Sequence, residues 1–104
     1  MKKVLLVGKH LTIIPPIEKL AVKNIALFAA ATLADVQRVF AENNNEIEII
    51  VMGAGIELES RLEIVKFVFN ACDSVTVHLK DKASGPEEFI PFINKVLKGL
   101  LSSD

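Results

Sequence analysis

The sequence predicts an α/β domain whose parallel strands are covered by helices on both faces. The main observation is the segment 46–55 (EIEIIVMGAG), a continuous apolar run that ends in Gly-Ala-Gly and leads into a helical pattern from Glu57. A strand without alternating polar residues, followed by glycine and a helix, is typical of a parallel sheet buried on both sides. Strand-like runs and helical patterns alternate along the chain, and the first run also ends at a glycine, Gly8.

The first half of the chain contains two expected strands. Residues 2–7 (KKVLLV) form the first, and residues 23–29 (KNIALFA) form the second. A short crossover helix is expected between them at 17–22, after a pair of prolines. In a competing interpretation, residues 17–42 form one long alanine-rich helix instead.

A helix is also expected from Thr32 to the three consecutive asparagines at 43–45. Thr32 is a suitable N-cap, and Asp35 follows three residues later as a variant of the capping box. The apolar residues of this segment recur at helical spacing, at Leu33, Val36, Val39 and Phe40.

The second half of the chain predicts a helix over 57–71, a strand over 75–79 and a final helix opened by the segment 84–86 (SGP). Pro91, further inside the final helix, should kink it or delay its regular start. The complete order is βαβαβαβα. Strands joined by right-handed crossover helices run parallel, so a three-layer sandwich with four parallel strands is expected.

Length and composition limit the possible functions. The chain of 104 residues forms a single domain, 1–104, and its net charge of -1 argues against a nucleic-acid binder. Charged residues interrupt every apolar run before the roughly 18 residues that a membrane span needs, so no membrane association is expected. The N-terminus is interpreted as mature, and the single Cys72 cannot form an internal disulfide, so we expect a cytoplasmic protein.

Residues 49–97 resemble the C-terminal half of a response-regulator receiver domain. They contain a strand, an amphipathic helix ending near a small residue and an acidic turn, a strand ending in Lys80, and a helix opened by Pro-Glu-Glu. Residues 31–44 resemble an earlier receiver helix, and residues 2–8 resemble the first receiver strand. The resemblance implies a flavodoxin-like sandwich with its parallel strands in the order 2-1-3-4 and helices on both faces.

The residues that give receivers their phosphoacceptor chemistry are replaced in this chain. A receiver places an acidic pair after its first strand to hold Mg²⁺, and a phosphoacceptor Asp at the end of its central strand. The corresponding segments here are 8–10 (GKH) and 52–54 (MGA). Only Lys80 matches a functional receiver position, and Asp81 stands where a proline usually follows. We therefore predict a degenerate receiver-like domain with no catalytic residue, metal or cofactor.

A candidate ligand site lies at the carboxyl ends of the strands, where open α/β sheets bind ligands. The residues expected at this edge are Gly8, Lys9, His10, Gly53, Gly55 and Lys80. The turn 53–55 could present backbone amides to a phosphate, although such turns also serve simply to redirect the chain into a helix. Sugar phosphotransferase carriers of similar fold place their phosphorylated residue after the first strand, but the segment around His10 does not match a carrier loop.

Both helices of the second half carry more apolar residues than one core-facing stripe requires. In the helix 57–71, the stripe expected to cover the sheet consists of Leu58, Leu62, Val65 and Phe69. The surplus residues of the two helices, which are expected to face a partner, are Ile64, Phe67, Val68, Ile90, Leu97 and Leu101. Surplus apolar surface often marks an interaction site, although two helices that pack on each other would show the same pattern.

These observations predict a non-catalytic module that binds a protein partner and self-associates as a homodimer. In receivers the corresponding helix, strand and helix form a dimer face, so the resemblance implies the same surface. The alternative is a small-molecule or phosphate-binding protein, including a phosphocarrier, that uses the carboxyl edge. A third alternative, an enzyme, is the least favoured, because no nucleophile, base or acid pair converges at that edge.

Overall fold

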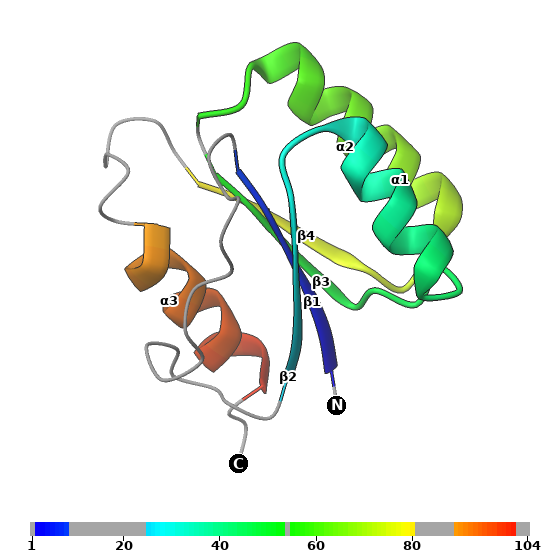
Figure 1. Cartoon of the computed structure of the whole chain (residues 1–104). Helices are drawn as coiled ribbons and strands as arrows, with labels where there is room; N and C mark the ends of the chain where they lie inside the picture. Colours follow the sequence, from blue (N-terminus) through cyan, green and yellow to red (C-terminus); the bar gives the residue numbers. More distant parts are fainter. Residues whose placement is uncertain (1, 9–24, 54, 81–88, 102–104) are drawn as a thin grey trace.

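The chain folds around a four-stranded sheet with helices on both sides (Figure 1). The computed structural model describes residues 2–8, 25–53, 55–80 and 89–101. The described elements are, in chain order, β1 (Lys2–Val7), β2 (Ile25–Ala30), α1 (Leu33–Glu42), β3 (Ile49–Met52), α2 (Leu58–Ala71), β4 (Thr76–Leu79) and α3 (Phe89–Leu101). The helix expected at 17–22 and the segment 84–86 lie outside the described residues.

Neighbouring strands all run parallel, in the order β2-β1-β3-β4. Val4 of β1 pairs with Leu27 on one side and with Ile49 on the other, so β1 is a central strand. This confirms the predicted strand order. The competing interpretation of 17–42 as one helix is wrong, because residues 25–30 form β2. Alanine favours a helix locally, but pairing with β1 and burial against it outweigh that propensity.

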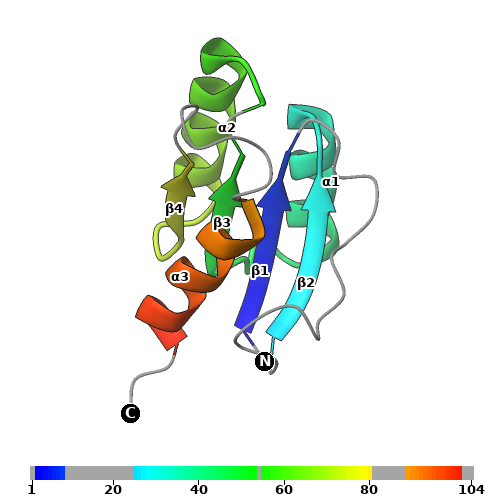
Figure 2. The same ribbon diagram turned by 90° about the vertical axis from the view of Figure 1, so that its left-hand side faces the viewer.

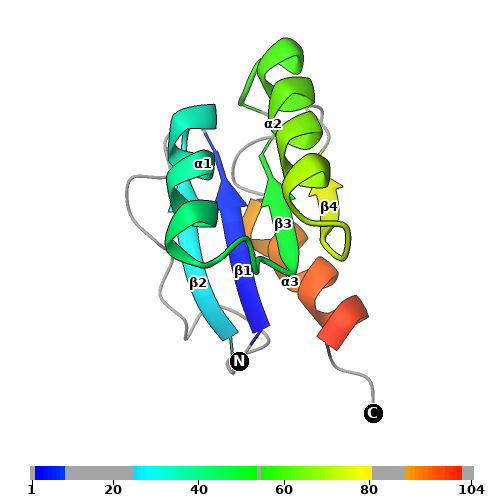
Figure 3. The same cartoon turned by 90° about the vertical axis from the view of Figure 1, so that its right-hand side faces the viewer.

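Helices α1 and α2 pack on one face of the sheet, and α3 packs on the other. Figure 3 shows α1 over β2 and β1, and α2 over β3 and β4, while Figure 2 shows α3 on the opposite face. Leu5 and Val7 of β1 face α1 and α2, whereas Val4 and Leu6 face α3. Burial on both faces explains the uninterrupted apolar sequence of β1. The result is a three-layer, flavodoxin-like arrangement.

The ends of α1 form as the sequence predicts. The Asp35 backbone N–H donates to Thr32 Oγ1 over 3.2 Å, and Asp35 Oδ2 accepts a hydrogen bond from the Ala31 N–H over 3.1 Å. The two bonds together resemble a capping box whose second bond is shifted by one residue. At the other end, Asn44 and Asn45 have φ angles of 55° and 59°, in the left-handed region that asparagine tolerates better than most residues.

The other described boundaries lie within a few residues of the predicted ones. α2 begins at Leu58, with Glu57 at its N-cap, and β4 begins at Thr76. Pro91 lies in the first turn of α3 as described, where its missing N–H removes no hydrogen bond within the described helix. Among the described residues, no helix has the length and apolar character to cross a membrane.

Candidate functional site

The carboxyl edge of the sheet brings three of the predicted site residues into one row. Gly8, Gly53 and Lys80 each donate a backbone N–H to the last residue of the neighbouring strand, at 3.0, 2.7 and 2.9 Å. These bonds extend the parallel ladders by one residue beyond the strand ends. Gly8 and Gly53 are buried, whereas Gly55 is exposed in the turn that leads to α2.

A basic side chain that sequence reasoning missed, Arg61, approaches the same edge from α2. Its Nη2 donates to the Lys80 carbonyl oxygen at 2.8 Å, and its Nε is buried without a hydrogen-bond partner among the described residues. Lys80 is only 3% exposed. The sequence feature that could have indicated Arg61 is that it is the one basic residue in the first turns of α2. Lys9 and His10, also predicted for this edge, lie outside the described residues.

The groups at the carboxyl edge can attract an anion. The N-terminus of α2 presents backbone N–H groups with partial positive charge. Arg61 adds a guanidinium, a group that binds carboxylates and phosphates through charge-assisted hydrogen bonds. Glu57 and Glu59, both exposed at the start of α2, oppose this attraction. The edge therefore fits a weakly bound anion better than a tightly held one.

A second candidate site is an apolar surface on α2 and the edge strand β4. Residues of α2 at the spacing i, i+4, i+7 and i+11 form one stripe, and β4 adds a leucine on the face of the sheet that α2 covers. This α2–β4 surface consists of Leu58, Leu62, Val65, Phe69 and Leu79. Four of these side chains are strongly exposed, with 65% for Leu58, 57% for Leu62, 50% for Phe69 and 46% for Leu79.

Most residues of the two apolar stripes of α2 have roles opposite to those predicted, although Val65 packs half-buried against the core as expected. Ile64 and Val68, expected to face a partner, are 1% and 0% exposed in the core. The ring of Phe67 packs edge-on against Phe40 of α1, with 5.6 Å between the centroids. Helical spacing identifies both stripes but does not show which one faces the sheet. Packing against the sheet and α1 sets the rotation of the helix, so that Leu62 points outward.

The expectation for α3 is also corrected. Leu97 is fully buried in the core between α3 and the sheet, and Ile90 is half-buried against the same core. The side chain of Leu101 lies outside the described residues. The expectation that Leu97 lies on a free flank is wrong because, among the described helices, only α3 covers this face and it fills the core with a wide apolar sector. Leu100, by contrast, is 41% exposed.

Two titratable side chains have pKa values shifted by their surroundings. His78 lies on the α3 face of β4, with its Nε2 3.1 Å from Thr76 Oγ1, and burial lowers the pKa of the imidazole because it disfavours the charged form. The hydrogen bond from the Ala31 N–H is the largest cause that lowers the pKa of the Asp35 carboxyl. Asp35 bonds to the residue that follows β2 at the carboxyl edge, so its carboxylate adds negative charge near Gly8, whereas His78 lies on the opposite face of the sheet from the α2–β4 surface.

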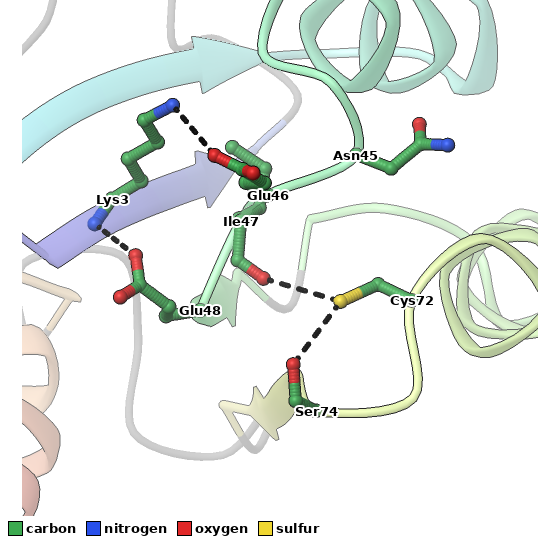
Figure 4. A pocket seen from close by; sticks show the side chains of 7 residues that line it. All are labelled: Lys3, Asn45, Glu46, Ile47, Glu48, Cys72 and Ser74. Atoms are coloured by element: carbon green, nitrogen blue, oxygen red, sulfur yellow. Dashed lines mark hydrogen bonds and ion pairs between the residues drawn. The ribbon is translucent and has the colours of Figure 1, made fainter.

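The described residues also surround a hollow of about 320 Å³ at the amino edge of the sheet (Figure 4). Its lining consists of Lys3, Asn45, Glu46, Ile47, Glu48, Cys72 and Ser74. The Lys3 N–H donates to Glu48 Oε1 at 2.7 Å, and Lys3 Nζ lies 3.8 Å from Glu46 Oε1. The Cys72 Sγ lies 3.9 Å from the Ile47 carbonyl oxygen. The charged groups of this hollow are thus already paired, since Glu48 Oε2 also lies 3.6 Å from Nζ of the neighbouring Lys2.

Within the described residues, the α2–β4 surface and the carboxyl edge are the candidate sites considered for function. Comparison of the chain with models of protein families, with curated proteins and with solved structures found no match. No cluster of three or more potential metal ligands occurs within the described ranges. The function is therefore inferred from the geometry and chemistry of these two surfaces.

Proposed function

We propose that this chain is a non-catalytic, receiver-like interaction module that pairs with a second copy of itself through the α2–β4 surface. The observation that carries the proposal is the exposure of Leu58, Leu62, Phe69 and Leu79, between 46% and 65%, on one helix stripe and the adjacent strand. Large apolar side chains gathered on one surface mark interaction sites more often than scattered ones do. The receiver resemblance supports the same surface, because receivers dimerise through the equivalent elements.

The charges beside the stripe favour a second copy as the partner. In an antiparallel pair of α2 helices centred between residues 63 and 64, Leu58 lies level with Phe69 of the second copy. Exposed Glu59, Glu63 and Lys66 all lie on the same side of the stripe. In this pairing Lys66 lies between the levels of the two glutamates of the other copy, and the two-fold axis repeats the arrangement. In this pairing the charges beside the stripe are complementary, and the apolar residues of the two stripes lie at matching levels.

The apolar contribution to association is of the same order as the free-energy cost of bringing two copies together. Full burial of one Leu or Phe side chain contributes about 1.5–3 kcal/mol. Four half-exposed side chains on each of two copies would bring on the order of 6–12 kcal/mol, which is comparable with the roughly 4–15 kcal/mol lost in association. We therefore expect a reversible homodimer whose population depends on concentration.

The direct test is the mass of the particle in solution, measured by size-exclusion chromatography with light scattering. The wild-type protein is expected to be a dimer, and Leu62→Glu or Phe69→Glu to give a monomer with an unchanged circular dichroism spectrum. The new carboxylate stays in water in the monomer, since both positions are exposed. The matched control, Gln37→Glu on the exposed face of α1, should remain dimeric. A wild-type monomer at high concentration would remove the proposal.

The antiparallel arrangement has a separate test in charge exchange. Lys66→Glu places like charges together in the dimer, and so does the double variant Glu59→Lys, Glu63→Lys. Each protein alone should dissociate more readily than the wild type, whereas an equimolar mixture should form a heterodimer, because every pair at the interface is then of opposite sign. A mixture that stays monomeric would contradict this pairing of the helices.

A second candidate function, anion binding at the carboxyl edge, is favoured by Arg61 and its unpaired, buried Nε. Addition of inorganic phosphate should then shift the backbone amide resonances of Gly8, Gly53 and Gly55. The shifts should disappear in Arg61→Gln and persist in the control Arg38→Gln, whose arginine is exposed on α1. Unchanged resonances at high phosphate concentration would exclude this function.

A further inference from the structure

The outer side of β4 is a free strand edge among the described residues. β4 is the last strand in the order β2-β1-β3-β4, and it pairs only with β3. The N–H of Thr76 donates to the Glu48 carbonyl and that of Lys80 to the Met52 carbonyl, at 3.0 and 2.9 Å. Hydrogen bonds in a parallel strand alternate in direction from one residue to the next. The N–H and C=O groups of Val77 and Leu79 therefore point away from β3.

Such an edge readily pairs with another strand. Proteins usually protect exposed edges with proline, with charged side chains or with a covering element. The sequence of β4, TVHL, contains neither proline nor lysine, arginine, aspartate or glutamate. The backbone of β4 is therefore chemically ready to accept a further strand.

We infer, building on the self-association proposed above, that the two copies join their β4 strands antiparallel and form one continuous sheet across the dimer. A two-fold axis perpendicular to the sheet at the β4 edge brings both α2 helices onto the same face in antiparallel orientation. This is the orientation that Lys66 and the two glutamates favour. The packing of Phe67 on Phe40 places α1 on one side of α2, so the stripe on the opposite side faces the joint between the two sheets.

The side chains of β4 select one register for this pairing. Only residues whose backbone groups point outward can form the hydrogen-bonded pairs, so Val77 pairs with Val77 of the second copy, and Leu79 with Val75. These are apolar pairs on the face that α2 covers. On the other face, Thr76 then lies opposite His78. A shift of two residues in one direction would instead bring the two His78 side chains together, and like residues that can both be protonated pair poorly. A shift in the other direction would place Leu79 opposite Asp73 and so remove its apolar partner Val75.

The inference is tested by Val77→Pro, which removes the outward N–H and leaves the N–H groups that bond to β3 in place, while also replacing the valine side chain. Proline is tolerated at strand edges where the N–H bonds to no neighbour within the sheet. The variant is expected to be a folded monomer by light scattering and circular dichroism. The matched control Val77→Ala loses side-chain packing but keeps the N–H, and it should still dimerise.

Hydrogen exchange provides a second measurement that does not depend on the folding of the proline variant. The amides of Val77 and Leu79 should exchange at least about tenfold more slowly in the wild-type dimer than in the Leu62→Glu monomer. Equal rates in the two proteins, or a Val77→Pro variant that stays dimeric, would overturn the strand pairing while leaving dimerisation through α2 intact. A wild-type protein that is monomeric would instead remove both proposals.

Discussion

Leu62 and Ile64 are two residues apart on α2 and have opposite environments, with exposures of 57% and 1%. Removal of a buried side chain leaves a cavity and loses dispersion contacts, so Ile64→Ala should lower the free energy of unfolding by about 2–5 kcal/mol. Leu62→Ala should change it by less than about 0.5 kcal/mol. Urea unfolding in the Phe69→Glu background, which is expected to be monomeric, separates these effects from association. Equal losses at the two positions would contradict the orientation of α2.

A second prediction at the residue scale concerns the pH dependence of stability. Burial lowers the pKa of His78 from its usual 6.5, so the unfolded chain binds the proton more readily than the folded one. Stability is therefore expected to fall as the pH drops below 6.5, until the pH passes below the pKa of the folded state.

Urea unfolding of wild type and His78→Gln at about pH 7.5 and about pH 5.5 checks this expectation. The variant should lose less stability on acidification than the wild type. The second histidine of the chain, His10, is present in both proteins, so the difference between them isolates His78. An equal loss in both proteins would show that His78 does not contribute.

At the scale of elements, α3 contains a glycine that its surroundings do not require. A Cβ added at Gly99 meets no heavy atom within 4 Å. Glycine loses more backbone entropy on folding than alanine, so Gly99→Ala should raise the free energy of unfolding by about 0.5–1 kcal/mol. Urea unfolding measures the change, with Lys95→Ala on the exposed face of α3 as a control that should have little effect. A loss of stability at residue 99 would indicate a packing role for this position.

The three helices differ in how far their sequences predict which face of each helix is buried. The capping residues of α1 and its apolar spacing predicted both its ends and its buried face, because a single apolar stripe leaves one possible orientation. α2 has two stripes of similar apolar character, and its orientation depends on contacts with the sheet and with α1. α3 has a wide apolar sector because, among the described helices, it alone covers the face of the sheet opposite α1 and α2.

At the scale of the whole molecule, the fold is a four-stranded, flavodoxin-like sandwich, and the two segments that correspond to the acidic positions of the receiver resemblance are not acidic. The segments 8–10 and 52–54 carry no carboxylate, so no nucleophile is available for an aspartyl phosphate and no acidic pair for Mg²⁺. We expect no Mg²⁺-dependent mass increase when the intact protein is incubated with acetyl phosphate. A stable phosphoadduct would contradict this prediction, and an adduct located at His10 would support a phosphocarrier.

Part of the carboxyl-edge site was predictable because the ends of parallel strands meet at one edge. The row of Gly8, Gly53 and Lys80 follows directly from strand order and from the residues that end each strand. Arg61 was not predictable in this way. It reaches the Lys80 carbonyl from α2, and that contact depends on how the helix crosses the sheet.

By itself, the sequence determined the order of the described strands and helices, the parallel sheet and the two-sided burial of its central strands. These properties follow from apolar periodicity, glycines and capping residues, which act over a few neighbouring positions. Only the tertiary structure decided that Ile64 and Val68 are core while Leu58, Leu62 and Phe69 are exposed. The physical reason is that the rotation of a helix about its axis is set by the residues it packs against, and these lie far away in the chain.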